Sequence, residues 1–298
     1  MKMKKTIFTG AGVAIATPFN DDGSINYDEL GRLIDFNIEN GTDAIIICGT
    51  TGESATMSDE EHIECIRFAV EKTAKRVPVI AGTGSNDTKY AIELSKKAEE
   101  LGADALLLVT PYYNKTSQAG LVAHYKMIAE AVSLPIIVYS VASRTGVNIT
   151  PETCVELAKI PNIVAIKEAS GNISQIAQIA ALCGDSLDIY SGNDDQIIPI
   201  MALGGKGVIS VLSNVMPREA HDIAMLCLEN KYEEARKLDF RIHQLSKDLF
   251  CDVNPIPVKH ALNVMGFKAG PCRMPLCEMS DANKAKLEGT MKKLGLIK

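Results

Sequence analysis

Short apolar runs alternate with amphipathic stretches along most of this chain. Eight runs lack the polar alternation of a half-exposed strand, which predicts strands buried on both faces, as in a parallel sheet covered by helices. They span residues 12–17, 44–49, 77–81, 105–110, 136–139, 163–167, 187–191 and 207–211. Between them lie stretches such as 59–74 and 88–101, in which apolar residues recur at the three-to-four spacing of a helix.

Eight strand-and-helix units predict an α/β fold closed into a (β/α)8 TIM barrel, because an open doubly wound sheet of this length shows fewer repeats. An open sheet would also carry a phosphate-binding glycine turn after its first strand. Gly10-Ala11-Gly12 precedes the predicted first strand, and Gly82-Thr83-Gly84 has no third glycine at the required distance. The chain therefore lacks the nucleotide-binding glycine turns.

Beyond residue 217 the predicted strands stop and helical patterns follow, at 218–229, 231–250, 257–265 and 280–294. Apolar residues such as Leu245, Phe250 and Leu262 are too frequent here for a flexible tail. We predict a catalytic barrel over residues 1–229 and a C-terminal helical extension over residues 230–298, packed on the barrel or on another subunit.

Composition and charge limit the function classes. The 298 residues are 46% hydrophobic and 23% charged, the usage of a soluble globular protein, and the net charge of -6 argues against a nucleic-acid surface. The start Met1-Lys2-Met3-Lys4-Lys5 resembles the head of a signal peptide, but the apolar segment behind it breaks at Pro18 and is too short for export or a bilayer span. We expect a cytoplasmic protein with neither nucleic-acid nor membrane partners.

Neither a metal site nor disulfides are indicated. The eight cysteines form no Cys-x-x-Cys pair, so we expect reduced thiols packed as small apolar groups. The five histidines form no ligand pair at helical spacing, and we expect most of them at the surface or at an interface, with His62 as an exception.

Lys167 closes the apolar run Ile163-Val164-Ala165-Ile166, an unfavourable place for a charged side chain. Partial burial disfavours the ammonium and lowers its pKa, so that the neutral amine can attack a carbonyl carbon and form a Schiff base. Taken alone, a lysine at the end of a strand is more often one whose long stem carries its charge out to solvent.

Tyr139 is placed in the same way, at the end of the run Pro135-Ile136-Ile137-Val138. In a parallel barrel both side chains emerge at the carboxyl ends of strands, where the working groups of such barrels sit. A tyrosine there can shuttle protons during imine formation, although alone it also fits a core tyrosine. Thr50 and Thr51 end another strand and could share that proton, although such a turn is more often only a turn.

Six segments of the chain carry a resemblance. They are GTTGES (49–54), TPYYNK (110–115), YSVASRTG (139–146), IKEASGN (166–172), YSGNDD (190–195) and NPIPVK (254–259). Together they resemble the dihydrodipicolinate synthase family of lysine biosynthesis over essentially the whole chain. The resemblance implies a carbon–oxygen lyase that condenses pyruvate with L-aspartate 4-semialdehyde on the diaminopimelate route. It also implies a homotetramer made of two tight dimers, although the sequence leaves dimer against tetramer open.

The resemblance assigns the catalytic residues. Lys167 would form the Schiff base with pyruvate, so that no separate cofactor is expected. Tyr139, Thr50 and Tyr113 would form the proton relay, with Tyr113 reaching into the site of a neighbouring subunit.

The resemblance also assigns the substrate-binding residues. The main-chain amides of Thr50 and Thr51 would hold the pyruvate carboxylate, with Gly192 and Ile209 lining the same pocket. Arg144 would bind the carboxylate of aspartate semialdehyde, a role that suits the paired donors of a guanidinium, although alone it would be a surface arginine in a loop.

Two residues depart from the usual family segment, because Ser140 stands in place of an asparagine and Ala142 in place of a proline. Loss of the proline frees the backbone of the loop that carries Arg144, so we expect altered rates rather than altered chemistry.

A second departure concerns regulation. Lysine-inhibited members of the family bind lysine near positions that match Ser54, Ala55, Asp59, His62, Asn86, Tyr90 and Tyr112. In the feedback-sensitive pattern, Tyr90 would be a glutamate and Asp59 a histidine. We expect weak or absent lysine inhibition, because the missing carboxylate weakens capture of an amino group.

The nearest alternative is a sister pyruvate-dependent aldolase, such as N-acetylneuraminate lyase or a 2-keto-3-deoxy-sugar-acid aldolase. Those enzymes share the lysine, the tyrosine and the Gly-x-x-Gly-Glu turn, but generally lack the Ser-Arg-Thr-Gly run that contains Arg144. A third interpretation is a catalytically silent barrel that binds a keto acid. The presence of every relay residue argues against it, since binding alone requires no proton relay.

Overall fold

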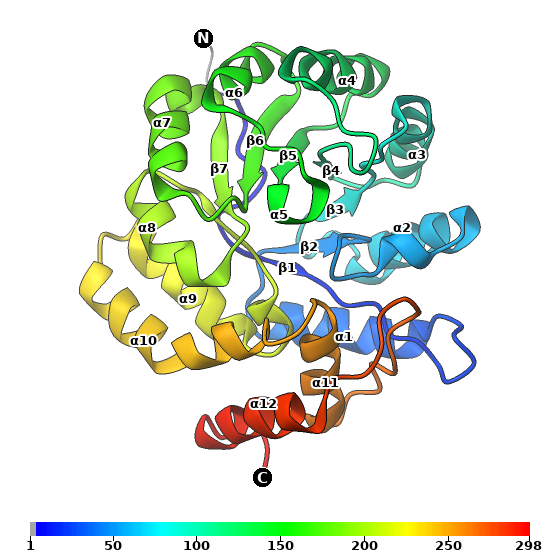
Figure 1. Cartoon of the computed structure of the whole chain (residues 1–298), viewed down its shortest axis with the longest axis vertical. Coiled ribbons are helices and arrows are strands. Elements are labelled where there is room, and N and C mark those ends of the chain that lie inside the picture. The colour runs from blue at the N-terminus through cyan, green and yellow to red at the C-terminus, as the bar shows by residue number, and fades with distance from the viewer. Residues whose placement is uncertain (1–3) are drawn as a thin grey trace.

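The protein is a closed barrel of eight parallel strands in chain order, each paired with the next and β8 with β1 (Figure 1). This computed structural model describes residues 4–298, so Met1 to Met3 of the basic start lie outside the described residues. The strands are β1 (Gly10–Ala14), β2 (Ala44–Ile47), β3 (Val79–Gly82), β4 (Ala105–Val109), β5 (Ile136–Ser140), β6 (Ile163–Glu168), β7 (Asp188–Ser191) and β8 (Gly207–Ser210). The predicted TIM barrel is confirmed.

Helices surround the barrel and link successive strands (Figure 1). They are α1 (Tyr27–Glu39), α2 (Asp59–Thr73), α3 (Thr88–Glu100), α4 (Gln118–Ala131), α5 (Ala142–Thr145), α6 (Pro151–Ala158), α7 (Ile173–Cys183), α8 (Ile197–Ala202) and α9 (Pro217–Leu228). Short 3-10 turns are η1 (Ser54–Thr56), η2 (Gly184–Ser186), η3 (Asp194–Gln196) and η4 (Leu212–Asn214).

The C-terminal extension is helical, as predicted, with α10 (Tyr232–Asp248), α11 (Ile256–Val264) and α12 (Asp281–Lys293). Leu245 and Leu249 of this region belong to the same buried cluster as the apolar faces of the barrel helices. The predicted division between residues 229 and 230 falls in the link from α9 to α10, and it stays a prediction.

The start of α2 follows from a reciprocal cap. The Ser58 hydroxyl accepts a hydrogen bond from the Glu61 amide, and the Glu61 carboxylate accepts one from the Ser58 amide. Asp59 and Glu60 add negative charge at the positive end of the helix dipole. The sequence signal at residue 58 therefore marks the true start of this helix.

Two apolar layers form the core, because successive side chains of a strand point to opposite faces. One layer fills the barrel interior, with Ile46, Ile80, Leu107 and Ile137 among its members, and the other lies between the strands and the helices. Below β1, Phe8 stacks on Tyr190 with ring centres 4.4 Å apart. Apolar packing thus closes the amino-terminal end of the barrel and leaves the carboxyl end for a site.

The predicted start of the first strand is wrong, since Gly10-Ala11-Gly12 belongs to β1 and does not precede it. A Cβ at Gly10 would lie 2.0 Å from Oδ2 of Asp43, and a Cβ at Gly12 would lie 2.6 Å from Cδ1 of Ile46. These glycines therefore permit close packing within a strand, whereas their sequence suggested a turn. Each end of the other seven strands lies within two residues of its predicted position.

The expectations for histidine and cysteine hold for most residues of each type, with exceptions. His124 is buried, as His62 is, with its Nδ1 2.9 Å from the Thr88 hydroxyl, whereas the other three histidines are partly exposed. All eight cysteines are free thiols, and five are buried as expected, but Cys277 is exposed. Within residues 4–298, no helix has the length and apolar character that crossing a membrane requires.

Candidate active site

A cavity of about 220 Å³ opens among residues that end or follow the barrel strands. Six of the eight predicted site residues line it. These are Thr50, Thr51, Tyr139, Arg144, Lys167 and Gly192. They come from four different strand ends and from α5, so the site depends on closure of the barrel.

Lys167 lies on β6 beside its register partner Tyr139 on β5, and only 6% of the lysine is exposed. Burial lowers the pKa of Lys167 to about 7, while the negative charge of Asp194 acts in the opposite direction and the positive charge of Arg144 lowers it further. The ammonium nitrogen lies 4.2 Å from the centre of the Tyr139 ring, a cation–π contact. The amine is therefore substantially neutral at neutral pH, as a nucleophile must be.

Tyr139 is buried, and burial raises the pKa of its phenol to about 12. The positive charge of Arg144 and a polar contact with the Thr50 side chain both act in the opposite direction. The phenol is thus protonated at neutral pH and lies beside the amine. It can donate a proton to a departing oxygen and recover it through a neighbouring hydroxyl.

The turn from Gly49 to Glu53 places Thr50 and Thr51 at the cavity. Its backbone closes through hydrogen bonds from the Gly52 amide to the Gly49 carbonyl and from the Glu53 amide to the Thr50 carbonyl, both 3.1 Å long. The Thr51 hydroxyl accepts a hydrogen bond from the Asn254 side-chain amide at 3.0 Å. A segment of the C-terminal extension therefore holds the turn from above.

Arg144 lies in the single turn of α5 at the mouth of the cavity, and its Nη2 donates to the Asn254 carbonyl at 3.2 Å. The remaining guanidinium donors can bind a carboxylate. Ala142 is the first residue of α5, a position where proline pre-organises a helix, so its replacement of the usual proline removes rigidity from the support of Arg144. The hydroxyl of Ser140, the other residue that departs from the family segment, accepts a hydrogen bond from the Ile149 amide and donates one to Oδ1 of Asn148.

Two predicted site residues are not among those that line the cavity. Ile209 lies on β8 and is buried in the barrel interior with Tyr139. Tyr113 is 92% exposed, in the loop after β4, with a left-handed φ of 69°. In a single chain it therefore takes no part in the cavity.

Sequence reasoning assigned no role to two further residues at this site. Asn254 lines the cavity and bonds to Thr51, and its place in the NPIPVK segment was the only signal. Asp194 is the buried first residue of η3, shortly after β7, and its Oδ2 accepts hydrogen bonds from the amides of Val211 and Leu212 at 3.1 and 2.9 Å. Its Oδ1 has no hydrogen-bond partner among residues 4–298. Its proximity to a strand end was the available signal.

A neighbouring cavity of about 500 Å³ contains five of the seven positions that the resemblance connects with lysine binding. These are Ser54, Ala55, His62, Tyr90 and Tyr112. Outside its lining, the Asp59 carboxylate accepts a hydrogen bond from the Tyr90 hydroxyl at 2.6 Å. Thr50 and Arg144 line this cavity as well as the smaller one, so the two cavities adjoin.

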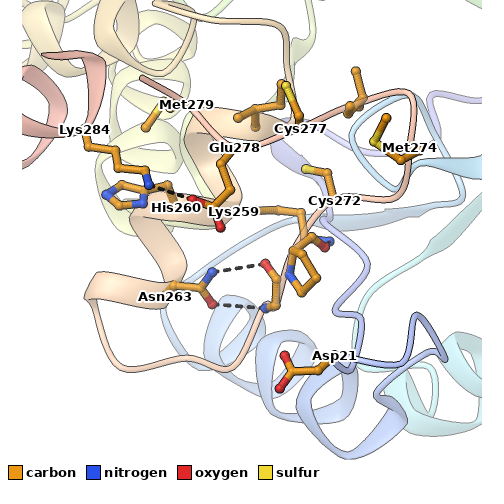
Figure 2. Close-up of a pocket in the computed structure, with 14 residues that line it drawn as sticks. Asp21, Lys259, His260, Asn263, Cys272, Met274, Cys277, Glu278, Met279 and Lys284 are labelled. Atoms are coloured by element: carbon orange, nitrogen blue, oxygen red, sulfur yellow. Dashed lines mark hydrogen bonds and ion pairs between the residues drawn. The ribbon is translucent and has the colours of Figure 1, made fainter. Parts of the chain in front are cut away.

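A third cavity, of about 510 Å³, lies in the C-terminal extension (Figure 2). Several of its polar side chains already have partners: Glu278 pairs with Lys284 at 2.8 Å, and Asn263 bonds to both main-chain groups of Gly270. No predicted site residue lines it. Across the described part of the chain, no group of three or more histidine, cysteine, aspartate or glutamate side chains could hold a metal ion.

Comparison with known proteins identifies the family. The model of the dihydrodipicolinate synthetase family matches residues 7–294. The 4-hydroxy-tetrahydrodipicolinate synthases of Caldicellulosiruptor bescii and Lachnoclostridium phytofermentans are 58% and 59% identical, each covering 98% of this chain, and 98% and 99% of those proteins are covered in turn. A crystal structure of the chloride-inhibited dihydrodipicolinate synthase of Acinetobacter baumannii complexed with pyruvate has a TM-score of 0.96 and 44% identity, covering 98% of this chain and 100% of that one.

These relatives confirm the predicted lyase of lysine biosynthesis and give no support to the sister aldolases. The chain belongs to the dihydrodipicolinate synthetase family.

Proposed function

We propose that the chain condenses pyruvate with L-aspartate 4-semialdehyde through a Schiff base on Lys167, without a separate cofactor. The observation that carries this proposal is a buried lysine with a pKa of about 7 in a cavity of about 220 Å³, a size that suits a small keto acid. The A. baumannii relative is described as complexed with pyruvate, which supports pyruvate as the first substrate.

The proposed reaction starts when the Lys167 amine attacks the keto carbon of pyruvate. The resulting carbinolamine loses water to give an imine, and Tyr139 donates the proton that the departing oxygen needs. The Tyr139 phenolate takes a proton from the methyl carbon to give an enamine, whose carbon attacks the aldehyde of the second substrate. The amino group of that substrate then attacks the imine carbon, which closes the ring of the product and releases the Lys167 amine. Thr50, whose side chain contacts the phenol, passes protons to and from Tyr139.

The pyruvate carboxylate is bound by the main-chain amides of Thr50 and Thr51, which belong to a tightly closed turn. Gly192 lines the same cavity, and a Cβ at this position would lie 3.2 Å from Cε of Lys167. Glycine here therefore leaves space around the nucleophile. Ile209 contributes from the barrel interior, below the cavity.

Arg144 binds the carboxylate of aspartate semialdehyde at the cavity mouth. Its position above Lys167 and Tyr139 suits a second substrate that enters after the enamine has formed. This role also distinguishes the proposed reaction from that of the sugar-acid aldolases, whose substrates present a polyol at the same place.

The relay is completed by Tyr113 of a second copy of the chain in a homotetramer, a dimer of dimers that works in the cytoplasm. The exposure of Tyr113 supports this part of the proposal, because an aromatic ring that is 92% exposed on a loop with a left-handed φ is available to a neighbouring subunit. Sedimentation velocity of the purified chain tests the homotetramer. The turnover rate of Tyr113→Phe tests the role of the Tyr113 hydroxyl in the relay.

The deciding experiment is turnover of pyruvate with aspartate semialdehyde, coupled to a downstream reductase and followed by NADPH oxidation. Turnover that disappears in Lys167→Ala supports the proposal. If there is no turnover but borohydride still traps pyruvate on Lys167, the second substrate is wrong, and sugar acids are to be tested next.

A further inference from the structure

A buried ion pair joins the C-terminal extension to the turn that carries Thr50 and Thr51. Lys259 of α11 lies with its Nζ 2.9 Å from Oε1 of Glu53, the last residue of that turn, and both side chains are at most 2% exposed. Removing two charges from water is so unfavourable that a buried pair contributes little net stability, and an apolar pair of similar volume often does as well. Stability alone therefore does not explain this pair.

Both partners of the pair make further contacts. The Lys259 amine donates to the Pro271 carbonyl at 2.6 Å and lies 4.2 Å from the centre of the Phe19 ring. Oε2 of Glu53 accepts a hydrogen bond from the Arg273 main-chain amide at 2.9 Å. Two separate segments of the extension thus hold one carboxylate in a single position.

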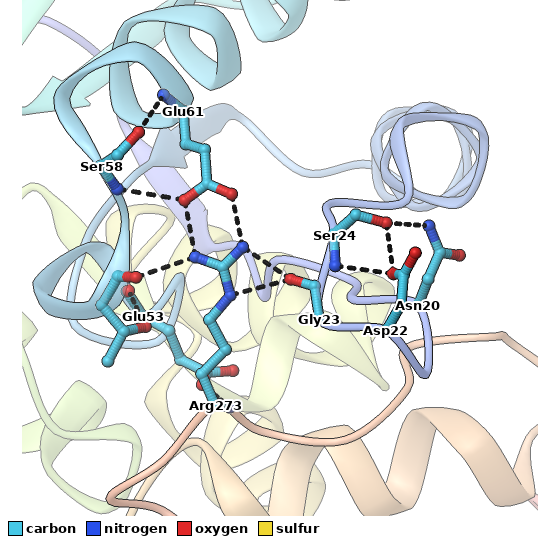
Figure 3. Close-up of polar contacts among 9 residues, drawn as sticks. Asn20, Asp22, Gly23, Ser24, Glu53, Ser58, Glu61 and Arg273 are labelled. Carbon is cyan, nitrogen blue, oxygen red and sulfur yellow. Dashed lines mark hydrogen bonds and ion pairs between the residues drawn. The ribbon is translucent and has the colours of Figure 1, made fainter.

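Arg273 is itself fixed from several directions (Figure 3). Its guanidinium pairs with Glu61 at the start of α2 and donates to the carbonyls of Gly23 and Thr56, at 3.0 and 2.8 Å through Nε and Nη1. Its centre lies 4.3 Å from the Phe19 ring. The amide that holds Glu53 is therefore anchored to the barrel around the turn.

The turn needs such support, because the residue before it and its own last residue adopt an unfavourable backbone conformation. Cys48 and Glu53 each have a φ of 55°, in the left-handed region, although neither is glycine. Conformations of this kind are unfavourable for residues other than glycine and persist only where the surroundings impose them. At Glu53 the surroundings are Lys259 and Arg273.

We propose that Glu53 and Lys259, with the Arg273 amide, are positioning residues that hold the Thr50-Thr51 turn in its pyruvate-binding geometry. The inference rests on the proposed function, since it assigns the turn to binding of the pyruvate carboxylate. Glu53 does not line the cavity that contains Lys167, although it does line the adjoining cavity, so its effect on pyruvate binding is exerted through the turn. The extension is accordingly part of the active-site framework, reaching the turn through this pair and through Asn254.

The test compares Glu53→Gln and the double variant Glu53→Gln/Lys259→Met with the unchanged chain. Glu53→Gln removes the carboxylate and leaves the Lys259 ammonium without its partner. The double variant removes both charges, so that neither side chain of the pair leaves an unpaired buried charge. We expect kcat/KM for pyruvate to fall by roughly 10- to 100-fold, mainly through a higher KM, because a misplaced binding group loses orientation. The pyruvate concentration for half-maximal borohydride trapping on Lys167 rises in parallel.

Asp248→Asn is the matched control, because Asp248 is a buried carboxylate of the same extension that does not contact the turn. It accepts from Thr290 Oγ1 at 2.7 Å and pairs with Lys286 at 3.0 Å. This variant is expected to lower the melting temperature while keeping the KM for pyruvate. A readout of KM thus separates a positioning role from a loss of general stability.

Variants at Glu53 that keep the normal KM for pyruvate and the normal trapping curve would overturn the inference, as would an equal rise of KM in Asp248→Asn. If the double variant does not fold, Glu53→Gln decides by the same two measurements. Failure of the proposed function gives a different result, because the unchanged chain would then show no condensation. Its trapping curve would still report whether Glu53 positions the turn.

Discussion

The Lys167 amine lies 4.2 Å from the centre of the Tyr139 ring, and the two residues are register partners on neighbouring strands. The face of an aromatic ring attracts an ammonium ion, whereas burial favours the neutral amine. Burial is the larger effect, and the pKa of Lys167 falls to about 7. The tyrosine thus has two separable parts, a ring that faces the nucleophile and a hydroxyl that can move protons.

The first prediction concerns the pH dependence of imine formation. Only the neutral amine attacks pyruvate, so the initial rate of borohydride trapping should rise with pH and reach half its maximum near pH 7, the pKa of Lys167. An ordinary lysine, with a pKa of about 10.4, would still be gaining rate above pH 9. A midpoint in that higher range would contradict the proposed desolvation of Lys167.

The second prediction tests Asp194 as the charge that opposes desolvation. Its carboxylate raises the pKa of Lys167, so Asp194→Asn should move the trapping midpoint to lower pH. The asparagine oxygen can still accept hydrogen bonds from the Val211 and Leu212 amides, which keeps the loop after β8 in place. Asp195→Asn, at the neighbouring position, serves as control and should leave the midpoint unchanged, because the charge of Asp195 is not among those that shift the pKa of Lys167. An upward shift in Asp194→Asn would refute this role.

The third prediction separates the two parts of Tyr139. Tyr139→Phe retains the ring beside Lys167 and removes only the hydroxyl, so the midpoint of the trapping profile should change little. Turnover should fall by roughly 10²- to 10⁴-fold, the usual contribution of a general acid–base group. Steady-state kinetics and the trapping profile on the same preparation check both statements. Retention of full kcat would exclude Tyr139 from the relay.

The local part of the fold and site could be predicted from sequence. A lysine and a tyrosine that each close an apolar run mark the ends of buried strands, and closure of the barrel then brings Lys167 and Tyr139 together. The first strand was placed too late because Gly10 and Gly12 suggest a turn when their neighbours in space are unknown. Asp43 and Ile46, which exclude any side chain there, are far along the chain.

Long-range support of the site could not be predicted. The Asn254 side chain reaches Thr51 across 203 residues, and Lys259 reaches Glu53 across 206. No periodicity connects such positions, and their pairing follows only from how the extension packs on the barrel. The surroundings of Tyr113 do not follow from a single chain at all, because its proposed partner lies on another copy of the chain.

The fourth prediction concerns Arg144, whose guanidinium stands at the cavity mouth and bonds to the Asn254 carbonyl. Arg144→Ala should raise the KM for aspartate semialdehyde by roughly 10-fold or more, because a charge-assisted pair is lost. Pyruvate should still be trapped on Lys167. The positive charge of Arg144 lowers the pKa of Lys167, so the trapping midpoint should also move to higher pH. Loss of trapping at every pH would contradict a role limited to the second substrate.

The fifth prediction is weak or absent inhibition by lysine. The Tyr90 hydroxyl donates to the Asp59 carboxylate at 2.6 Å, so this carboxylate already has a partner and does not line the adjoining cavity. An incoming ammonium group therefore lacks the free carboxylate that the feedback-sensitive pattern supplies at position 90. Steady-state rates with and without added lysine, at pyruvate near its KM, measure the effect. Tyr90→Glu/Asp59→His restores the sensitive pattern and should gain inhibition. Strong inhibition of the unchanged chain at lysine concentrations well below those of the substrates would show that another group captures the amine.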